Sequence, residues 1–173
     1  MKRIIVIGSG GAGKSTFATK LGHLLDLQVI HLDKLFWKPG WVEPPRDEWL
    51  QTVTELVNRD SWIIDGNYSG TLDVRIQKCD TIIFLDMPRL LCLWRILKRN
   101  LQYRRGGRPD MAEGCREKLD YEFVSWVWNY SRRSRPRIME KLRKHSEGKR
   151  VVWLRSDADV KKFLSEPFSE PRR

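Results

Sequence analysis

The chain has 173 residues, of which 40% are hydrophobic and 32% charged, which fits one compact domain with a sizeable core. No stretch approaches the roughly 20 apolar residues of a membrane span, and a strand-like run starts almost at once, so we expect no membrane segment and no signal peptide. The three cysteines, an odd number without metal-like spacing, argue against a disulfide framework and favour a cytoplasmic protein.

The formal net charge of +11 is concentrated in one part of the sequence. Residues 1–94 hold equal numbers of basic and acidic side chains, whereas residues 95–150 hold 17 Lys or Arg against 7 Asp or Glu. Such a block is either a solvated basic face or a surface that attracts a polyanion, which could be a triphosphate or a nucleic acid. The block alone does not choose between these partners.

The first predicted strand, Arg3–Ile7, runs into a complete phosphate-binding pattern, G-x-x-x-x-G-K-[ST], and then into a predicted helix over Thr16–Leu25. Glycines let the backbone approach phosphates closely, and the N–H groups at the start of the helix face the anion. Lys14 is expected to reach the β- and γ-phosphates, and the Ser15 hydroxyl to bind Mg²⁺. The predicted ATP-binding residues here are Gly8, Ser9, Gly10, Gly11, Ala12, Gly13, Lys14, Ser15 and Thr16.

Further strands and helices alternate along the chain. The expected strands are Gln28–Leu32, Trp62–Ile64, Thr81–Leu85 and Val151–Leu154, and the expected helices are Asp47–Asn58, Pro88–Leu101, Met111–Tyr130, Pro136–His145 and Asp157–Leu164. This order predicts an α/β P-loop NTPase fold, a five-stranded parallel sheet with helices on both faces. We expect residues 1–165 to form one domain with a small helical lid at about 100–135, followed by a tail at 166–173.

Carboxylates follow three of the predicted strands, at the edge where parallel sheets bind ligands. Asp33 and Asp65 are candidates to hold a metal-bound water or to accept a hydroxyl proton. Asp33 could instead cap a helix or turn, and Asp65 could form an Asx-turn with Gly66. Asp86 is expected to cap the following helix rather than to act in chemistry.

Arginines in the basic block could supply positive charge opposite the phosphate loop. Arg95 and Arg99 stand four residues apart on one helix face, and Arg104, Arg105 and Arg108 lie in a glycine-bearing loop that could close over a triphosphate. Arg132, Arg133, Arg135 and Arg137 come after the next predicted helix, Met111–Tyr130, and could add to the same field. Each arginine taken singly could equally be a solvated surface charge.

Trp37 and Trp41 flank Lys38-Pro39-Gly40, just beyond Asp33. Their rings could line an acceptor pocket and sandwich a planar group, or they could pack in the core and lid, and packing is slightly favoured.

Together the phosphate loop, Trp62–Tyr68, the pair Arg95 and Arg99, and Arg108-Pro109-Asp110 resemble the adenylate kinase superfamily, and the chain as a whole resembles its topology modulation proteins. The resemblance implies that Arg95 stacks on adenine, Arg99 and the lid residue Arg108 face the phosphates, and Asp65 holds Mg²⁺ through water. It also implies that the loop at Ser156–Val160 lines the adenine.

One departure from that pattern, and one match to other kinases, bear on the acceptor. Asn67-Tyr68-Ser69 stands where adenylate kinases have Phe-Pro-Arg, whose arginine grips the acceptor monophosphate, so AMP is not expected. In shikimate-kinase-like relatives a carboxylate after the second strand receives the substrate hydroxyl, and Asp33 matches it. A nucleoside or another small hydroxyl compound stays open.

The sequence therefore predicts an ATP- and Mg²⁺-dependent phosphotransferase acting on a small-molecule acceptor. Its expected catalytic residues are Lys14, Asp33, Arg99, Arg104 and Arg108; its donor-side contacts add Arg95 and Ser156; its metal-binding residues are Ser15 and Asp65; and its acceptor-binding residues are Asp33, Trp37, Asp65, Asn67 and Tyr68. The alternative is an ATP-binding protein that binds DNA and modulates its topology, ranked second because a kinase lid already accounts for most of the basic residues. A switch-type NTPase is a weaker third hypothesis, supported only by the phosphate loop.

Overall fold

The computed structural model describes residues 1–103, 110–112, 114–115 and 120–167, and the structural statements below concern these residues. Its centre is an all-parallel sheet in the order β2-β3-β1-β4-β5. The strands are β1 (Arg3–Gly8), β2 (Val29–His31), β3 (Trp62–Asp65), β4 (Thr81–Leu85) and β5 (Arg150–Leu154). The helices are α1 (Lys14–Leu25), α2 (Leu32–Phe36), α3 (Arg46–Val57), α4 (Leu72–Lys78), α5 (Arg89–Tyr103), α6 (Tyr121–His145) and α7 (Asp157–Ser165), with a 3-10 turn, η1 (Ser69–Thr71), before α4.

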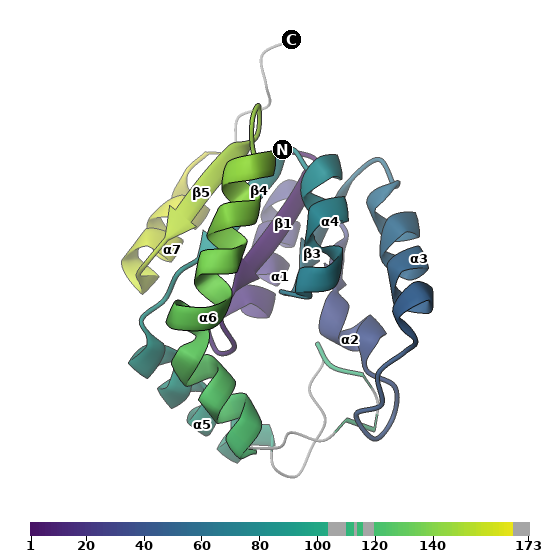
Figure 1. Cartoon of the computed structure of the whole chain (residues 1–173). Coiled ribbons are helices and arrows are strands. Elements are labelled where there is room, and N and C mark those ends of the chain that lie inside the picture. Colours follow the sequence, from purple (N-terminus) through teal and green to yellow (C-terminus); the bar gives the residue numbers. More distant parts are fainter. Residues whose placement is uncertain (104–109, 113, 116–119, 168–173) are drawn as a thin grey trace.

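Helices cover both faces of the sheet (Figure 1), as the alternation of elements predicted. The strands are rich in Ile and Val because parallel strands are buried on both sides. Alternate residues point to opposite faces: Ile5 and Phe84 pack in a core with α3, α4 and α6, whereas Ile4 and Ile83 pack in a second core with α1, α5 and α7. Each fully buried side chain of this size contributes about 1.5–3 kcal/mol to folding.

The long helix α6 corrects the prediction of two helices at 111–130 and 136–145. It is continuous from Tyr121 to His145, and the Asp120 carboxylate caps it by accepting a hydrogen bond from the Phe123 amide at 2.7 Å. Pro136 lies inside the helix and removes one backbone hydrogen bond. The helix continues through it because buried residues recur on one side, at Tyr130, Ile138 and Leu142.

Smaller differences concern short elements. The helices α2 and α4 were not predicted, since five and seven residues give too few turns for a hydrophobic period to be visible. The second strand ends at His31 because Leu32 already begins α2, whereas β3 continues to Asp65. Of the described helices, none is long and apolar enough to cross a membrane.

Candidate active site

The phosphate-binding loop connects β1 to α1 at the middle of the sheet, and its glycines are required by packing as well as by phosphate approach. A Cβ on Gly8 would lie 2.5 Å from the carbonyl oxygen of Leu85 in β4, and one on Gly11 would lie 2.3 Å from that of Cys92 in α5. Gly11 also has a φ of +73°, which larger residues rarely adopt. The loop is therefore fixed between the sheet and α5.

Lys14 folds back over this loop, and its Nζ donates to the Ser9 carbonyl oxygen at 3.0 Å. Burial lowers the pKa of the lysine, the carboxylates of Asp33 and Asp65 oppose this effect, and the guanidinium of Arg99 adds to it. These electrostatic partners show that the structure gathers Asp33, Asp65 and Arg99 around the lysine. All four were predicted site residues, brought together from separate elements.

Asp65 ends β3 with its carboxylate buried, and His31 at the end of β2 binds it. Nδ1 of His31 lies 2.7 Å from Oδ1 of Asp65, across a strand pair in which the two residues are in register. The hydrogen bond to Asp65 raises the pKa of His31, although burial acts in the opposite direction. Asp110 and Asp33 also raise this pKa, so Asp110 lies on the same side of the site. Sequence reasoning did not identify His31 as a partner of Asp65.

Asp33 in α2 is bound by Tyr68, whose hydroxyl donates to Oδ1 at 2.7 Å. Burial and the nearby Asp33 charge raise the pKa of Tyr68, so the phenol stays protonated and remains a donor. The Tyr68 ring packs against Phe36 (centroids 4.5 Å apart) and Trp49 (5.2 Å), and Trp37 meets Phe36 edge-on at 4.9 Å. Trp37 is therefore part of an aromatic cluster beside Asp33. This position is compatible both with packing and with lining an acceptor pocket.

Asn67 binds the first residue of the phosphate loop, Gly8, through both the oxygen and the nitrogen of its side-chain amide. Its Oδ1 accepts from the Gly8 N–H at 3.1 Å, and its Nδ2 donates to the Gly8 carbonyl oxygen at 2.6 Å. These bonds tie the segment after β3 to the first residue of the loop. The amide that was predicted to bind substrate thus contacts the protein backbone here.

Arg75 in α4 binds the backbone of the segment Gly66–Tyr68. Sequence reasoning missed this role. The side chain is fully buried, and its guanidinium donates to the carbonyl oxygens of Gly66 (2.8 Å), Asn67 (2.6 Å) and Tyr68 (3.0 Å). Burial lowers its pKa to about 10, which still leaves it charged at neutral pH. The backbone of Tyr68 has a φ of +24°, a strained value that these bonds stabilise.

Arg95, which was predicted to contact the ATP donor, lies in α5 and contacts the phosphate loop. Arg95 donates to the Ala12 carbonyl oxygen at 3.2 Å and pairs with Asp157 at 2.5 Å. Asp157 opens α7, and Ser156 caps that helix by accepting a hydrogen bond from the Asp159 amide. Arg104, Arg105 and Arg108, the predicted lid arginines, lie outside the described residues.

Asp86 does not serve mainly as the predicted helix cap. Its carboxylate accepts two hydrogen bonds at 3.0 and 2.9 Å from the guanidinium of Arg135, which bridges the end of β4 to α6. The pairing raises the pKa of Arg135. Arg135 therefore fastens α6 over the sheet.

Gly114 and Cys115, two described residues of the predicted lid, lie against the turn between α2 and α3. A Cβ on Gly114 would lie 3.1 Å from Pro39, and the Cys115 thiol donates to the Lys38 carbonyl oxygen at 3.3 Å. This turn closes through a backbone bridge between Lys38 and Val42 and carries Trp41 at a φ of +67°. Gly114 and Cys115 are thus held against the segment that carries Trp41.

Oxygen donors at this edge suit Mg²⁺. In the described part of the chain, no group of three or more His, Cys, Asp or Glu side chains could form a metal cage. Mg²⁺ in nucleotide sites uses one or two carboxylates together with phosphate oxygens and water. Ser15 at the start of α1 and the carboxylates of Asp33 and Asp65 near Lys14 offer that kind of donor set.

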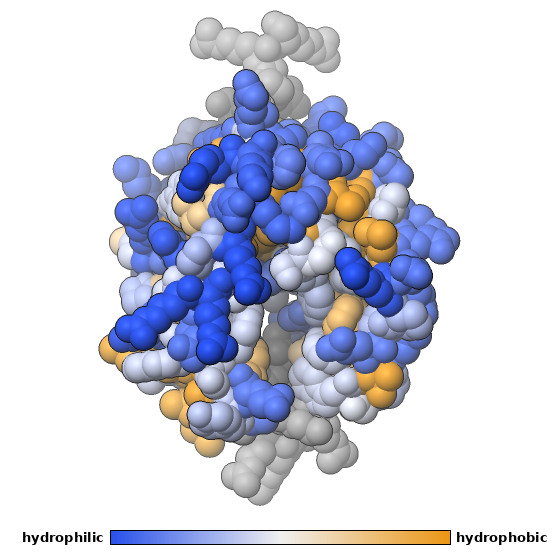
Figure 2. Space-filling view, viewed as in Figure 1, coloured by the Kyte–Doolittle hydropathy of each residue, from blue (hydrophilic) through white to orange (hydrophobic). Residues whose placement is uncertain are grey.

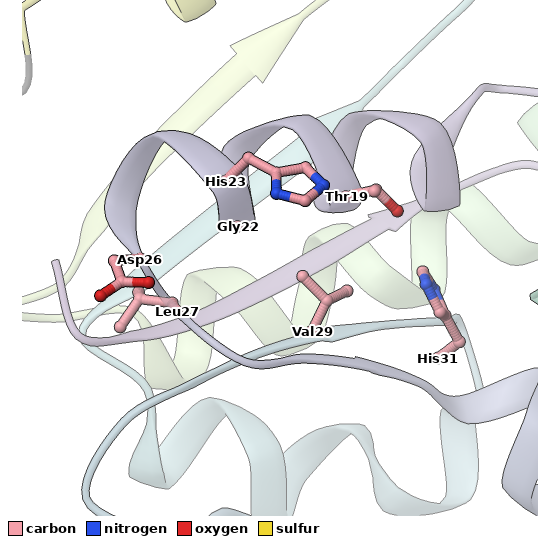
Figure 3. A pocket seen from close by; sticks show the side chains of 7 residues that line it. All are labelled: Thr19, Gly22, His23, Asp26, Leu27, Val29 and His31. Carbon is pink, nitrogen blue, oxygen red and sulfur yellow. The ribbon is translucent and has the colours of Figure 1, made fainter.

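Two hollows lie near the site. One of about 340 Å³ runs along the outer edge of the sheet between α1 and β2 (Figure 3), where Thr19, His23 and His31 line it. The other, of about 240 Å³, lies between the segment after β3 and α6. Figure 2 shows the face of the molecule that α4 and α6 cover, with a hollow near its centre.

Comparison with known proteins bears on the fold. No protein family and no curated protein matches the sequence. Among solved structures, a shikimate kinase from Acinetobacter baumannii in complex with shikimate matches with a TM-score of 0.57 and 15% identity over 95% of this chain and 89% of that one. At this level of identity the match shows the fold alone.

Two further structures agree. A sugar kinase from Janibacter sp. HTCC2649 matches with a TM-score of 0.52 and 17% identity over 95% of this chain and 93% of that one. A shikimate kinase from Bacteroides thetaiotaomicron matches with a TM-score of 0.51 and 16% identity over 94% of each chain. The α/β P-loop NTPase fold predicted from the sequence is confirmed.

Proposed function

We propose that the protein is an ATP-dependent phosphotransferase that moves the γ-phosphoryl group of ATP to a hydroxyl of a small molecule. The observation that carries the proposal is the gathering of Asp33, Asp65 and Arg99 around Lys14, at the end of a phosphate-binding loop in a kinase fold. Phosphoryl transfer needs held phosphates, a metal, and positive charge where the group passes. The site offers side chains for each of these tasks.

On the donor side, the amides of the loop and Lys14 would hold the phosphates, and Mg²⁺ would be held by Ser15 and, through water, by Asp65. The bound metal would neutralise developing charge on the phosphates. Arg99 would face the phosphates, while Arg95 and the Ser156 loop would lie toward the adenine. Support for this side comes from Arg95, which contacts both the loop at Ala12 and the start of α7.

On the acceptor side, Asp33 would receive the hydroxyl proton as the oxygen attacks. Tyr68 would orient that carboxylate, and Trp37 would wall the pocket. Solved kinases that match the fold include one bound to shikimate and one named a sugar kinase, so we propose an acceptor of similar size. A nucleoside or nucleotide stays within the proposal, as does membership of the topology modulation proteins.

The further expectations stay predictions: Arg104 and Arg108 as closing lid residues within about 100–135, one domain over 1–165, and a cytoplasmic location. Binding of nucleic acid stays second. Four described cations of the basic block already pair with carboxylates of this chain, which leaves less charge for a polyanion: Arg95, Arg135, Lys141 and Lys144.

The test is phosphoryl transfer from ATP and Mg²⁺ to a panel of nucleosides, nucleotides, sugars and hydroxy acids, followed by mass spectrometry. We expect one class to gain phosphate, and Lys14→Ala to abolish the gain. Lys20→Ala, which removes an exposed lysine of the same helix, should leave it unchanged. Absence of both ATP binding and transfer in the wild-type protein would refute the proposal.

A further inference from the structure

The smaller hollow, which we call the α6 groove, lies between the segment after β3 and one side of α6. Asn67, Tyr68 and Ser69 line one wall, and Trp126, Ser134 and Arg137 line the other. Its volume of about 240 Å³ is below the roughly 300–1,000 Å³ that encloses a drug-sized ligand. The groove therefore suits one end of a small metabolite.

The charge in the α6 groove is positive and available. Lys141 also lines it, but its ammonium group pairs with Asp73 at 2.5 Å and donates to the Ser69 carbonyl oxygen at 3.0 Å. Arg137 is exposed and forms no ion pair with any residue that the structure describes. A planar guanidinium binds carboxylate or phosphate through two parallel hydrogen bonds. The ligand that fits this groove is thus an anion.

The α6 groove is next to the reacting groups. Tyr68 reaches from its wall to Asp33, and Asn67 reaches to Gly8 of the phosphate loop. On the opposite wall, Trp126 stacks on Phe123, with ring centroids 6.1 Å apart, and a Cβ on Gly10 would lie 2.9 Å from the Phe123 ring. One wall therefore contacts the phosphate loop through Asn67, and the other lies beside it through Phe123.

The α6 groove is also separate from the donor side. Its lining includes Tyr68, Leu72 at the start of α4, and Ile138 of α6, which pack in the core on the α4 face of the sheet. The donor-side contacts of Arg95 and Asp157 come from α5 and α7, on the opposite face. An anion bound at Arg137 would accordingly belong to the acceptor rather than to ATP.

We propose that the acceptor is an anionic hydroxyl compound whose carboxylate or phosphate binds Arg137 in the α6 groove while its hydroxyl faces Asp33. Arg137 then selects the acceptor, and Ser134 and the Trp126 indole complete the walls around the bound group. This inference rests on the proposed function, because it assigns the substrate class of that same site.

The experiment compares matched acceptors: a hydroxy acid with its methyl ester, and a nucleoside monophosphate with its nucleoside. Each pair is assayed with the wild-type protein, Arg137→Gln and Arg137→Lys. Arg143→Gln is the control, since it removes the same charge from an exposed position of the same helix outside the groove. We expect the anionic member of one pair to be the preferred acceptor. Preference for the hydroxy acid would identify the bound group as a carboxylate, and preference for the nucleoside monophosphate would identify it as a phosphate.

Arg137→Gln should raise KM for that anionic acceptor by about 10- to 100-fold, as expected for lost charge-assisted hydrogen bonds. KM for ATP and for the neutral acceptor should stay unchanged, and Arg137→Lys should recover only part of the loss. Equal use of anionic and neutral members, or equal effects of Arg137→Gln and Arg143→Gln, would overturn the inference while leaving the kinase proposal intact.

If ATP binds but no panel compound gains phosphate, the inference is tested by measuring binding of the same compounds by calorimetry. An anionic compound that binds the wild-type protein and the Arg143→Gln variant but not Arg137→Gln supports the inference, and equal binding to all three overturns it. Failure to bind ATP at all refutes the proposed function itself, and the assignment of an acceptor falls with it.

Discussion

The Asn67 amide offers a sharp test of how the phosphate loop is held. Two substitutions separate its contacts: Asn67→Ala removes both hydrogen bonds to Gly8, and Asn67→Asp keeps an acceptor for the Gly8 N–H but loses the donor to its carbonyl oxygen. In the Asp variant two oxygens would face each other where a 2.6 Å hydrogen bond now exists.

The expected magnitude follows from burial and from the number of bonds. Gly8 is buried, so neither of its polar groups gains water when the amide is removed. A net hydrogen bond contributes about 1 kcal/mol, and a buried group left unsatisfied costs about 1–3 kcal/mol. We therefore expect Asn67→Ala to lower the free energy of unfolding by about 2–4 kcal/mol, and Asn67→Asp to lower it at least as much. ATP affinity should fall more in the Asp variant, because it adds negative charge beside the phosphates.

Urea unfolding followed by tryptophan fluorescence measures the stability, and calorimetry measures ATP binding. Ser69→Ala is the control, because Ser69 lies in the same segment with an exposed side chain, and surface changes usually stay within about 0.5 kcal/mol. If Asn67→Ala were as stable as the Ser69→Ala control and bound ATP equally well, the reasoning about this contact would be wrong.

Three further predictions follow from single side chains. Arg75→Met should lower the free energy of unfolding by about 3–5 kcal/mol, since three carbonyl groups that are buried or partly buried lose a charged donor. Arg75→Lys should lower it less in the same urea titration. Asp33→Asn should lower kcat by about 100-fold or more with the Kd for ATP unchanged, measured by steady-state kinetics and calorimetry. Burial raises the pKa of Asp80, but hydrogen bonds from Thr81, Arg3 and Lys2 outweigh it and hold the pKa below 3.8. Its contribution to stability is therefore present above pH 3.8 and lost as the pH falls through the folded-state pKa, so Asp80→Asn should flatten the acid side of a plot of unfolding midpoint against pH.

The features that the sequence predicted well are those with local causes. The phosphate loop is a complete pattern flanked by its own strand and helix, and β1, β4 and β5 are runs of apolar residues that differ by one residue or less from the prediction. The helix predicted at Asp157–Leu164 is present as α7, and the structure adds a reciprocal capping pair between Ser156 and Asp159.

The features that were missed depend on contacts between distant segments. Arg75 lies in a helix too short to show a period, and its partners become visible only when the segment after β3 folds over it. His31 meets Asp65 because β2 and β3 pair in register, 34 residues apart in sequence. Pro136 was taken as a helix boundary because the local rule for proline is strong, and only the tertiary burial of Ile138 and Leu142 overrides it.

The segment Gly66–Tyr68 joins the two halves of the site, and this has a consequence for how substitutions act. Asn67 fixes the phosphate loop at Gly8, Tyr68 fixes Asp33, and Arg75 holds the backbone of both. A change at Arg75 must therefore shift the donor and the acceptor groups together, and the kinetic constants for ATP and acceptor should change in parallel. Substitution of Trp37, whose ring packs against Phe36 and Trp41, should change the acceptor constants alone. The resemblance to adenylate kinases ends at Asn67-Tyr68. If this segment connects the ATP and acceptor groups instead of binding a monophosphate, Arg75 variants will change the constants for both substrates, and Trp37 variants only those for the acceptor.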